Sequence, residues 1–170
     1  MSDIENPATT TVHYPSDVVP APPEFDIDLP NGWEIGQVPG VLLASGPTSW
    51  EGPFRPNVTV AHGLAPRDVD PLDLARGYVE DMAEGSFEVI DLDRLDEDSA
   101  QLIVTLELAD PAIQVLQSIV VVKVDNRPPQ SGLTSVLTIT ASTSADRGEQ
   151  DGPVLLDIVR SVRIEVPTYS

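Results

Sequence analysis

The sequence predicts an α+β domain in which an antiparallel β-sheet of about six strands has helices packed on it, an α/β/α sandwich. Three observations support this prediction. Several stretches alternate apolar and polar residues with the period of two that is typical of half-buried strands. Two other stretches repeat apolar residues at helical spacing. Most of the expected strands follow one another without a helix between them, which favours antiparallel hairpins over a wound parallel sheet.

The first expected strand begins at Phe25, where Phe25, Ile27 and Leu29 alternate with aspartates. Residues 30–32, Pro-Asn-Gly, form a turn, and Trp33 directly after it is expected to be a core residue. Two further strands are expected over residues 41–44 and 57–62, separated by the Gly- and Pro-rich segment 46–56, which predicts an irregular loop.

The first helix is expected to begin at Asp70 and Pro71. The Asp70 side chain can accept a hydrogen bond from a free N–H group, and proline suits the first helical position because its missing N–H has no partner there. Gly77 either weakens this helix or allows a close approach to the sheet, and the sequence leaves both interpretations open. The expected apolar face comprises Ala75, Tyr78, Val79 and Met82, and Gly85 ends the helix.

A series of strands follows the first helix. They are expected around residues 87–91, 102–108, 115–124 and 136–141, with turns at Asp110-Pro111 and over residues 126–132. The strand over 136–141 is expected to be the last. A second helix is predicted to begin at residues 151–153, Asp-Gly-Pro, and to bury Val154, Leu155, Ile158, Val159 and Val162. Arg160 and Arg163 are expected near its end, where they favour the negative pole of the helix dipole.

The organisation is predicted to be one domain with a mobile arm. Residues 1–24 are rich in Pro, Thr and Asp and have few apolar side chains to offset the entropy of ordering them. We expect this arm to be disordered, acting either as a solubilising tail or as a segment that orders on a partner. The domain spans residues 25–166, and residues 167–170 are a tail.

The charge of the chain limits its partners. It has 28 acidic and 9 basic residues, a formal net charge of -19. This excludes a non-specific nucleic-acid binder, because phosphate attracts Lys and Arg and repels carboxylates. The N-terminus lacks the basic start and apolar run of a signal peptide, and no apolar run approaches the ~20 residues of a membrane span. We therefore expect a cytoplasmic protein without membrane insertion.

Five segments in order carry a family resemblance: Leu29-Pro30-Asn31-Gly32-Trp33, FRPNVTV at 54–60, LQSIVV at 116–121, VLTITA at 136–141 and IVRSVRI at 158–164. Together they resemble the actinobacterial LpqN/LpqT lipoprotein family over about residues 25–166. The resemblance implies a fold like that of PsbP and the Ran-binding Mog protein, and a protein-interaction scaffold with no shared catalytic residues to carry over. This chain departs from the family in lacking a signal peptide and a lipidated cysteine, so lipid anchoring is not implied.

The search for catalytic chemistry yields no motif. The chain has no cysteine, which excludes thiolate metal sites and cysteine nucleophiles. It also lacks a P-loop, a zinc-protease motif and a serine-hydrolase elbow. His13 lies in the predicted arm, and we interpret His62 as a structural residue because catalysis requires a positioned nucleophile and an orienting carboxylate. No catalytic residue and no cofactor is predicted.

The acidic run from residue 91 to residue 98 is the strongest candidate for a cation site. Asp91, Asp93, Asp96 and Asp98 supply several oxygens at short spacing, as Ca²⁺ requires. The EF-hand pattern is not met, because Leu95 stands at the third ligand position and Asp96 at the position of the invariant glycine. A solvated turn between two strands explains the run as well and is the favoured interpretation, so no metal ligand is predicted.

The strongest candidate for partner binding is the Gly- and Pro-rich loop, with Trp50, Phe54 and Arg55. Large aromatic side chains on such loops can anchor an interface. They can equally fold back over the edge of the sheet as a satellite core, and the scarcity of aromatic residues favours that second interpretation. The sequence does not establish whether Trp50 and Phe54 are exposed.

Three functions remain open. The first is a non-catalytic adaptor or chaperone-like protein that binds another protein with a basic or apolar patch, linked to an envelope or secretion system. The alternative is a small-molecule or lipid carrier with a pocket between sheet and helices, and the third is a carboxylate-based hydrolase. A deep apolar cavity of ~300 Å³ or more would favour the carrier, and a filled core with a flat exposed apolar patch would favour the adaptor.

Overall fold

The computed structural model describes residues 8–82, 86–109 and 112–169. Within them the strands are β1 (Glu24–Asp26), β2 (Trp33–Gly36), β3 (Leu43–Pro47), β4 (Asn57–Pro66), β5 (Phe87–Arg94), β6 (Ser99–Ala109), β7 (Ala112–Val124), β8 (Leu133–Ser144) and β9 (Arg163–Glu165), and the helices are α1 (Pro71–Met82) and α2 (Gly148–Arg160). Seven strands form an antiparallel sheet in the order β2-β3-β4-β8-β7-β6-β5, and β1 pairs with β9 in a separate two-stranded sheet. The predicted α+β class with an antiparallel sheet is confirmed.

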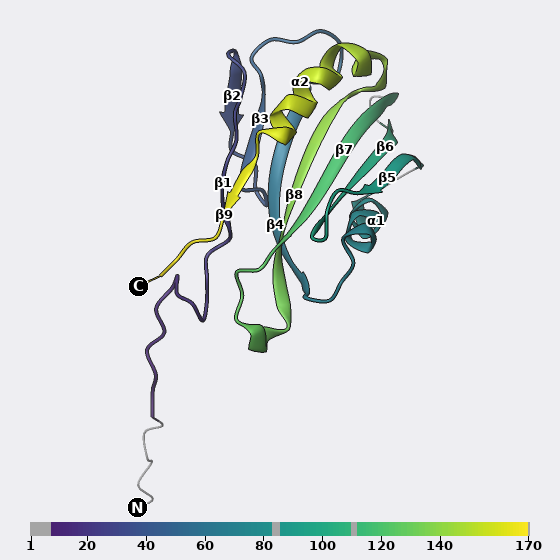
Figure 1. Ribbon diagram of the computed structural model, residues 1–170. Coiled ribbons are helices and arrows are strands. Elements are labelled where there is room, and N and C mark those ends of the chain that lie inside the picture. Colours follow the sequence, from purple (N-terminus) through teal and green to yellow (C-terminus); the bar gives the residue numbers. More distant parts are fainter. Residues whose placement is uncertain (1–7, 83–85, 110–111, 170) are drawn as a thin grey trace, which may run out of the picture.

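The two helices cover opposite faces of the seven-stranded sheet. Val120 packs in the cluster that includes Leu155 of α2, whereas its neighbour Val121 packs in the cluster that includes Val79 of α1. Successive side chains of a strand point to opposite faces, so the two clusters lie on different sides of β7. Figure 1 shows α2 across β4 and β8, and α1 beside β5 and β6. The molecule is therefore the predicted sandwich.

The first helix forms as the sequence predicts. Asp70 Oδ1 accepts a hydrogen bond from the Leu72 N–H at 2.8 Å, which caps the N-terminus of α1. Ala75 and Val79 are buried against the sheet. A Cβ built on Gly77 would meet nothing within 4 Å, so this glycine does not mediate a close approach. The side chain of Met82, Gly85 and the turn predicted at Asp110-Pro111 lie outside the described residues.

The predicted start of the second helix is wrong. A 3-10 turn over Ala145–Arg147 leads directly into α2, which begins at Gly148, so Pro153 lies inside the helix. Asp151 does not cap the helix, because its carboxylate accepts hydrogen bonds from Thr143 and Arg147 instead. Arg163 lies in β9, just past the end of α2, where its guanidinium donates to the carbonyl of the C-cap residue Ser161 at 3.0 Å and forms an ion pair with Asp28.

The strands also differ from their predicted lengths. The first expected strand shortens to β1, although Phe25, Ile27 and Leu29 all pack on the core beneath α2. The strand expected at residues 41–44 starts at Leu43 and continues to Pro47, and β4 and β8 extend past their predicted ends. Two strands, β2 and β9, were not predicted, so the strand over residues 136–141 is not the last. β2 forms because the next strand, β3, pairs with it, and β9 forms because β1, from the other end of the chain, pairs with it.

The end of the N-terminal arm contacts the domain. The Ala21 N–H donates to the Tyr169 hydroxyl at 2.9 Å, and the Asn126 side chain donates to the Ala21 carbonyl at 3.0 Å. Pro20 and Pro23 are buried. These contacts position the chain for the entry into β1, and the disorder expected for the earlier part of the arm stays a prediction. No helix of the described residues is long and apolar enough to cross a bilayer.

Candidate interaction site

The loop that joins β3 to β4, residues 48–56, is fixed from one side by Arg55. The guanidinium Nε donates to the Pro47 carbonyl at 2.9 Å, and Nη2 donates to the Gly46 carbonyl at 3.2 Å and to Glu34 Oε1 at 2.8 Å. The same guanidinium lies 5.2 Å from the centroid of the Trp50 ring, within the range of a cation–π contact. Arg55 therefore ties the loop to β2 and β3 and fixes the position of the Trp50 ring.

Gly46 makes this arrangement possible. A Cβ on this residue would lie 2.8 Å from the Pro56 carbonyl oxygen and 2.9 Å from Arg55 Nε. Both distances are shorter than a carbon atom tolerates, so a side chain here would displace the loop or the guanidinium. The requirement for glycine at residue 46 comes from packing and not from a turn, and the sequence alone did not reveal it.

Arg147 fixes the loop from the other side. Its guanidinium forms ion pairs with Glu51 of the loop at 3.3 Å and with Asp151 of α2 at 3.2 Å. The Thr143 hydroxyl donates to Asp151 at 2.6 Å and orients this carboxylate. The hydrogen bond from Arg147 to Asp151 is the main cause of the raised pKa of Arg147. The loop is thus joined to α2 as well as to the strands.

Between the loop and α2 lies a hollow of about 180 Å³. Both tryptophans of the chain line it, Trp33 from β2 and Trp50 from the loop. Trp50 is 46% exposed and Val154 of α2 is 42% exposed, so the rim presents apolar side chains to the solvent. The remaining lining residues are Pro47, Ser49, Pro56, Arg147, Asp151 and Leu155. We call this hollow the Trp50 groove.

The three residues predicted for partner binding take different places. Trp50 lines the groove and is more exposed than a satellite core would leave it. Arg55 contacts the Trp50 ring and supports it, and it lines a separate hollow of about 470 Å³ over β2, β3 and β4. Phe54 is half-buried and does not line the groove.

The sequence analysis missed two groove residues, Arg147 and Val154. Arg147 was given no role, and Val154 was placed in the buried apolar stripe of the second helix, whereas 42% of it is exposed. The sequence held one signal for Arg147. Glu51 is an isolated carboxylate in a Gly- and Pro-rich loop, which suggests a basic partner from another part of the chain.

His62 has the structural role expected of it. Its Nε2 lies 3.0 Å from the Ser135 hydroxyl, and Ser135 is fully buried, so this serine cannot meet a substrate. Burial is the main cause of the lowered pKa of His62, and the positive charge of Arg127 lowers it further. The two side chains therefore satisfy each other's polar atoms within the β4–β8 pair of strands.

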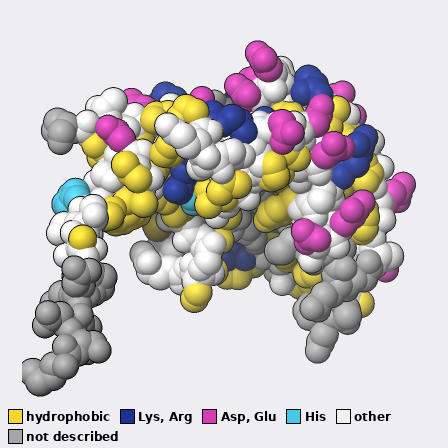
Figure 2. Space-filling view, turned by 90° about the horizontal axis from the view of Figure 1, so that it is seen from below, with side chains coloured by type: hydrophobic (Ala, Val, Ile, Leu, Met, Phe, Trp, Pro, Cys, Tyr) yellow, Lys and Arg dark blue, Asp and Glu magenta, His cyan; other side chains and the backbone are white. Residues whose placement is uncertain are grey.

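The acidic run forms the end of β5 and the turn that leads into β6. Asp96 Oδ1 accepts a hydrogen bond from the Asp98 N–H at 2.8 Å, as in a solvated Asx turn. This bond is the main cause of the lowered pKa of Asp96. In the part of the chain that the structure describes, no group of three or more such side chains is arranged to hold a metal ion. Acidic side chains gather on the side of α1 and β5 in Figure 2.

The fold is shared with solved structures of low sequence identity. LpqN, involved in cell envelope biogenesis of Mycobacterium tuberculosis, is 17% identical with a TM-score of 0.64, covering 92% of this chain and 90% of its own. Cyanobacterial PsbP from Synechocystis is 20% identical with a TM-score of 0.58, covering 82% and 86%. The Ran-binding protein Mog1p of Saccharomyces cerevisiae is 15% identical with a TM-score of 0.55, covering 84% and 90%.

These likenesses establish the fold. The LpqN-like architecture, which PsbP and Mog1p share, is the one that the sequence resemblance implied, and that expectation is confirmed. The sequence matches no family model and no curated protein.

Proposed function

We propose that this chain is a non-catalytic interaction protein that binds a partner protein through the Trp50 groove. The observation that carries the proposal is an exposed tryptophan whose loop is fixed by Arg55 on one side and Arg147 on the other. Tryptophan and arginine are the side chains that most often dominate the binding energy of an interface. A ring that is already fixed also loses little conformational entropy when a partner binds.

The dimensions of the groove suit one side chain of a partner. Its volume of about 180 Å³ is below the ~300 Å³ at which sites for whole small molecules begin. An apolar side chain in the groove would contact Trp33, Trp50 and Val154, and a cationic group beside it could pair with Asp151 or Glu51. The proposed partner therefore presents an apolar residue next to a basic one, in keeping with the net charge of -19.

The structural neighbours are compatible with this proposal. Mog1p is a Ran-binding protein, and LpqN takes part in cell envelope biogenesis. We propose an adaptor or chaperone-like role. An envelope or secretion system is the first process in which to test it. A cytoplasmic location also stays part of the proposal.

Affinity capture from the lysate of the source organism tests the proposal with three baits. The wild type is compared with Trp50→Ala and with a matched control, Phe87→Ala. Phe87 is an aromatic residue that is 38% exposed, and it lies on β5, the edge strand at the other side of the sheet. We expect one partner that the wild type and the Phe87 variant recover and that the Trp50 variant loses by about tenfold or more. Equal recovery by all three baits would refute the proposed site.

A second candidate function, the binding of a small apolar molecule, is favoured by one observation. A hollow of about 290 Å³ lies between α1 and the sheet, where Gly63 and Gly77 leave open space. Its walls include Leu74, Tyr78 and Val136, and Asp73 and Asp81 also line it. Native mass spectrometry of the freshly purified protein distinguishes the two functions, because a carrier would retain a ligand and Gly77→Leu would remove it. No observation favours the hydrolase.

A further inference from the structure

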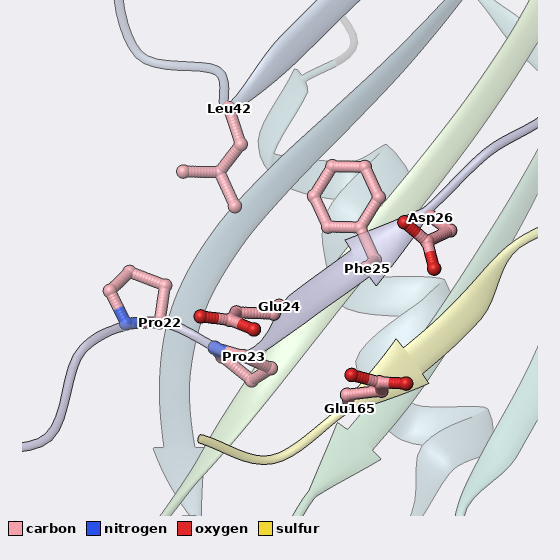
Figure 3. A pocket seen from close by; sticks show the side chains of 7 residues that line it. All are labelled: Pro22, Pro23, Glu24, Phe25, Asp26, Leu42 and Glu165. Atoms are coloured by element: carbon pink, nitrogen blue, oxygen red, sulfur yellow. The ribbon is translucent and has the colours of Figure 1, made fainter. Parts of the chain in front are cut away.

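A second groove lies at the opposite end of β3 from the Trp50 groove. Its volume is about 390 Å³. Pro22, Pro23 and Phe25 from the start of the domain and Leu42 from the entry of β3 give it apolar walls, as Figure 3 shows. We call it the β1 groove. Leu42 is 46% exposed, so part of this apolar surface faces solvent.

The β1 groove runs along a strand edge that has no partner. In the described part of the chain, β1 has β9 as its one neighbouring strand. Figure 3 shows β1 between β9 and Leu42, so the edge of β1 that faces away from β9 borders the groove. An unpaired edge presents backbone N–H and C=O groups to which an extended segment can add as a further strand.

The charged side chains that line the groove, Glu24, Asp26 and Glu165, are all acidic. Glu24 lies directly opposite Glu165 in the pairing of β1 with β9, and Asp26 lies opposite Arg163. Arg163 is engaged by Asp28, whose two carboxylate oxygens accept its hydrogen bonds at 3.0 and 3.1 Å. Among the described residues, neither Glu24 nor Glu165 forms an ion pair. Like charges directly opposite each other destabilise a pair of strands, so a cation placed here would relieve the repulsion.

We infer that the β1 groove binds an extended basic segment of a partner protein, which adds to the free edge of β1 as a strand. Its Lys or Arg side chains lie on the face of Glu24, Asp26 and Glu165, and the apolar side chain between them fits against Phe25 and Leu42. This alternation follows from the two-residue period of a strand. The groove is separate from the Trp50 groove, and the inference does not depend on the function proposed there.

The chemistry of the site argues against other occupants. A second copy of the chain carries the same net charge of -19 and is repelled. Residues 8–19 of the arm contain no Lys or Arg, so the arm does not supply the cation. A partner with alternating basic and apolar residues is the complementary one.

Titration of the full chain with the peptide acetyl-Val-Lys-Val-Lys-Val-amide, followed by ¹H–¹⁵N NMR, tests the inference. The wild type is compared with Glu24→Gln/Glu165→Gln and with a charge-matched control, Glu88→Gln/Asp93→Asn, whose exposed carboxylates lie on β5. We expect amide shifts in β1, β9 and around Leu42. The affinity falls by about tenfold in the groove variant and less than about twofold in the control.

A peptide with N-methylated valines tests the strand addition separately, because it cannot donate the backbone hydrogen bonds of these residues. We expect it to bind at least about fivefold more weakly than the parent peptide. Equal weakening of the two charge variants would show attraction to bulk charge only and overturn the inference. Unchanged affinity of the N-methylated peptide, or shifts that avoid the groove, would overturn it as well.

Discussion

The loop over residues 48–56 and the acidic turn over residues 95–98 both connect neighbouring strands, and they differ in what fixes them. The loop is joined to β2, β3 and α2 through Arg55 and Arg147. The carboxylate of Asp96 accepts its hydrogen bond from Asp98 within the turn, and the Leu95 N–H donates to Ser99 at 3.0 Å. The loop therefore depends on side chains that reach distant elements, whereas the turn is held by backbone groups, including the Lys123 N–H of β7, which donates to the Asp98 carbonyl at 2.8 Å.

This difference separates an interaction surface from a solvated one. The loop presents a large aromatic ring to solvent, and two arginines fix the loop. The chain has nine basic residues and a net charge of -19, so two of its few cations are used here. The turn presents carboxylates to water, where they need no partner. An exposed apolar side chain that distant elements fix in place is better suited to recognition than a local turn, because binding costs it less entropy.

The largest expected effect of a single change is that of Arg55→Ala. The substitution removes the donors to the Gly46 and Pro47 carbonyls and the cation beside Trp50. We expect the free energy of unfolding to fall by about 2–3 kcal/mol, measured by urea denaturation. Arg94→Ala at the end of β5 serves as the control. It removes an exposed ion pair with Asp70 and should cost less than about 1 kcal/mol. Equal losses would contradict the comparison.

Gly46→Ala should have the next largest effect. The new Cβ would collide with the Pro56 carbonyl and Arg55 Nε, so we expect a loss of about 1–2 kcal/mol and a changed tryptophan fluorescence spectrum, to which Trp33 and Trp50 both contribute. Gly63→Ala in β4 is the matched control, because a Cβ there meets nothing within 4 Å. If both variants were equally stable, the packing around Gly46 would be looser than described.

The acidic turn should respond to pH in a definite direction. Because hydrogen bonds lower the pKa of Asp96 below 3.8, its ionised form stabilises the folded turn at neutral pH. This stabilisation is complete above the unfolded value of about 3.8 and is lost as the pH falls through the folded pKa. The Asp98 amide shift reports the loss, and in Asp96→Ala this response should be absent, with less than about 1 kcal/mol of stability lost at pH 7. If the Asp98 amide shift still responded to pH in this variant, another titrating group would be its cause.

The smallest effect is expected for Asp93→Asn. Its side chain is exposed, and removing one charge from a chain of net charge -19 should leave the stability unchanged or raise it by at most about 0.5 kcal/mol. Thermal unfolding at low and high salt checks this, because salt should remove the difference. A clear destabilisation would show that the acidic run has a structural role that the hydrogen bonds do not reveal.

The sequence was informative where local chemistry decides the structure. Asp70 with Pro71 predicts the start of α1, and the alternation around Leu102 predicts β6, because caps and periodicity act within a few residues. It failed at β2, β9 and the start of α2. The four residues of β2 show no alternation of burial, β9 depends on its pairing with β1 at the other end of the chain, and Asp151 contacts Thr143 and Arg147 instead of capping α2.

The same distinction applies to the candidate site. Trp50 and Arg55 were predicted together because they share one loop, and the exposure of Trp50 could not be predicted because Arg55, Gly46 and α2 decide it jointly. Arg147 and Val154 come from the other end of the chain, and Trp33 was expected to be a core residue only. A groove built from three distant segments leaves no short motif in the sequence.

The central claim is that Trp50 is a fixed and exposed anchor, and the ¹H–¹⁵N heteronuclear NOE of the two indole groups tests it most directly. We predict that the indole of Trp50 gives an NOE as high as that of half-buried Trp33, because both lie in the ordered groove. A markedly lower NOE for Trp50 would mean that its ring moves freely on the nanosecond timescale, and this result would contradict the account.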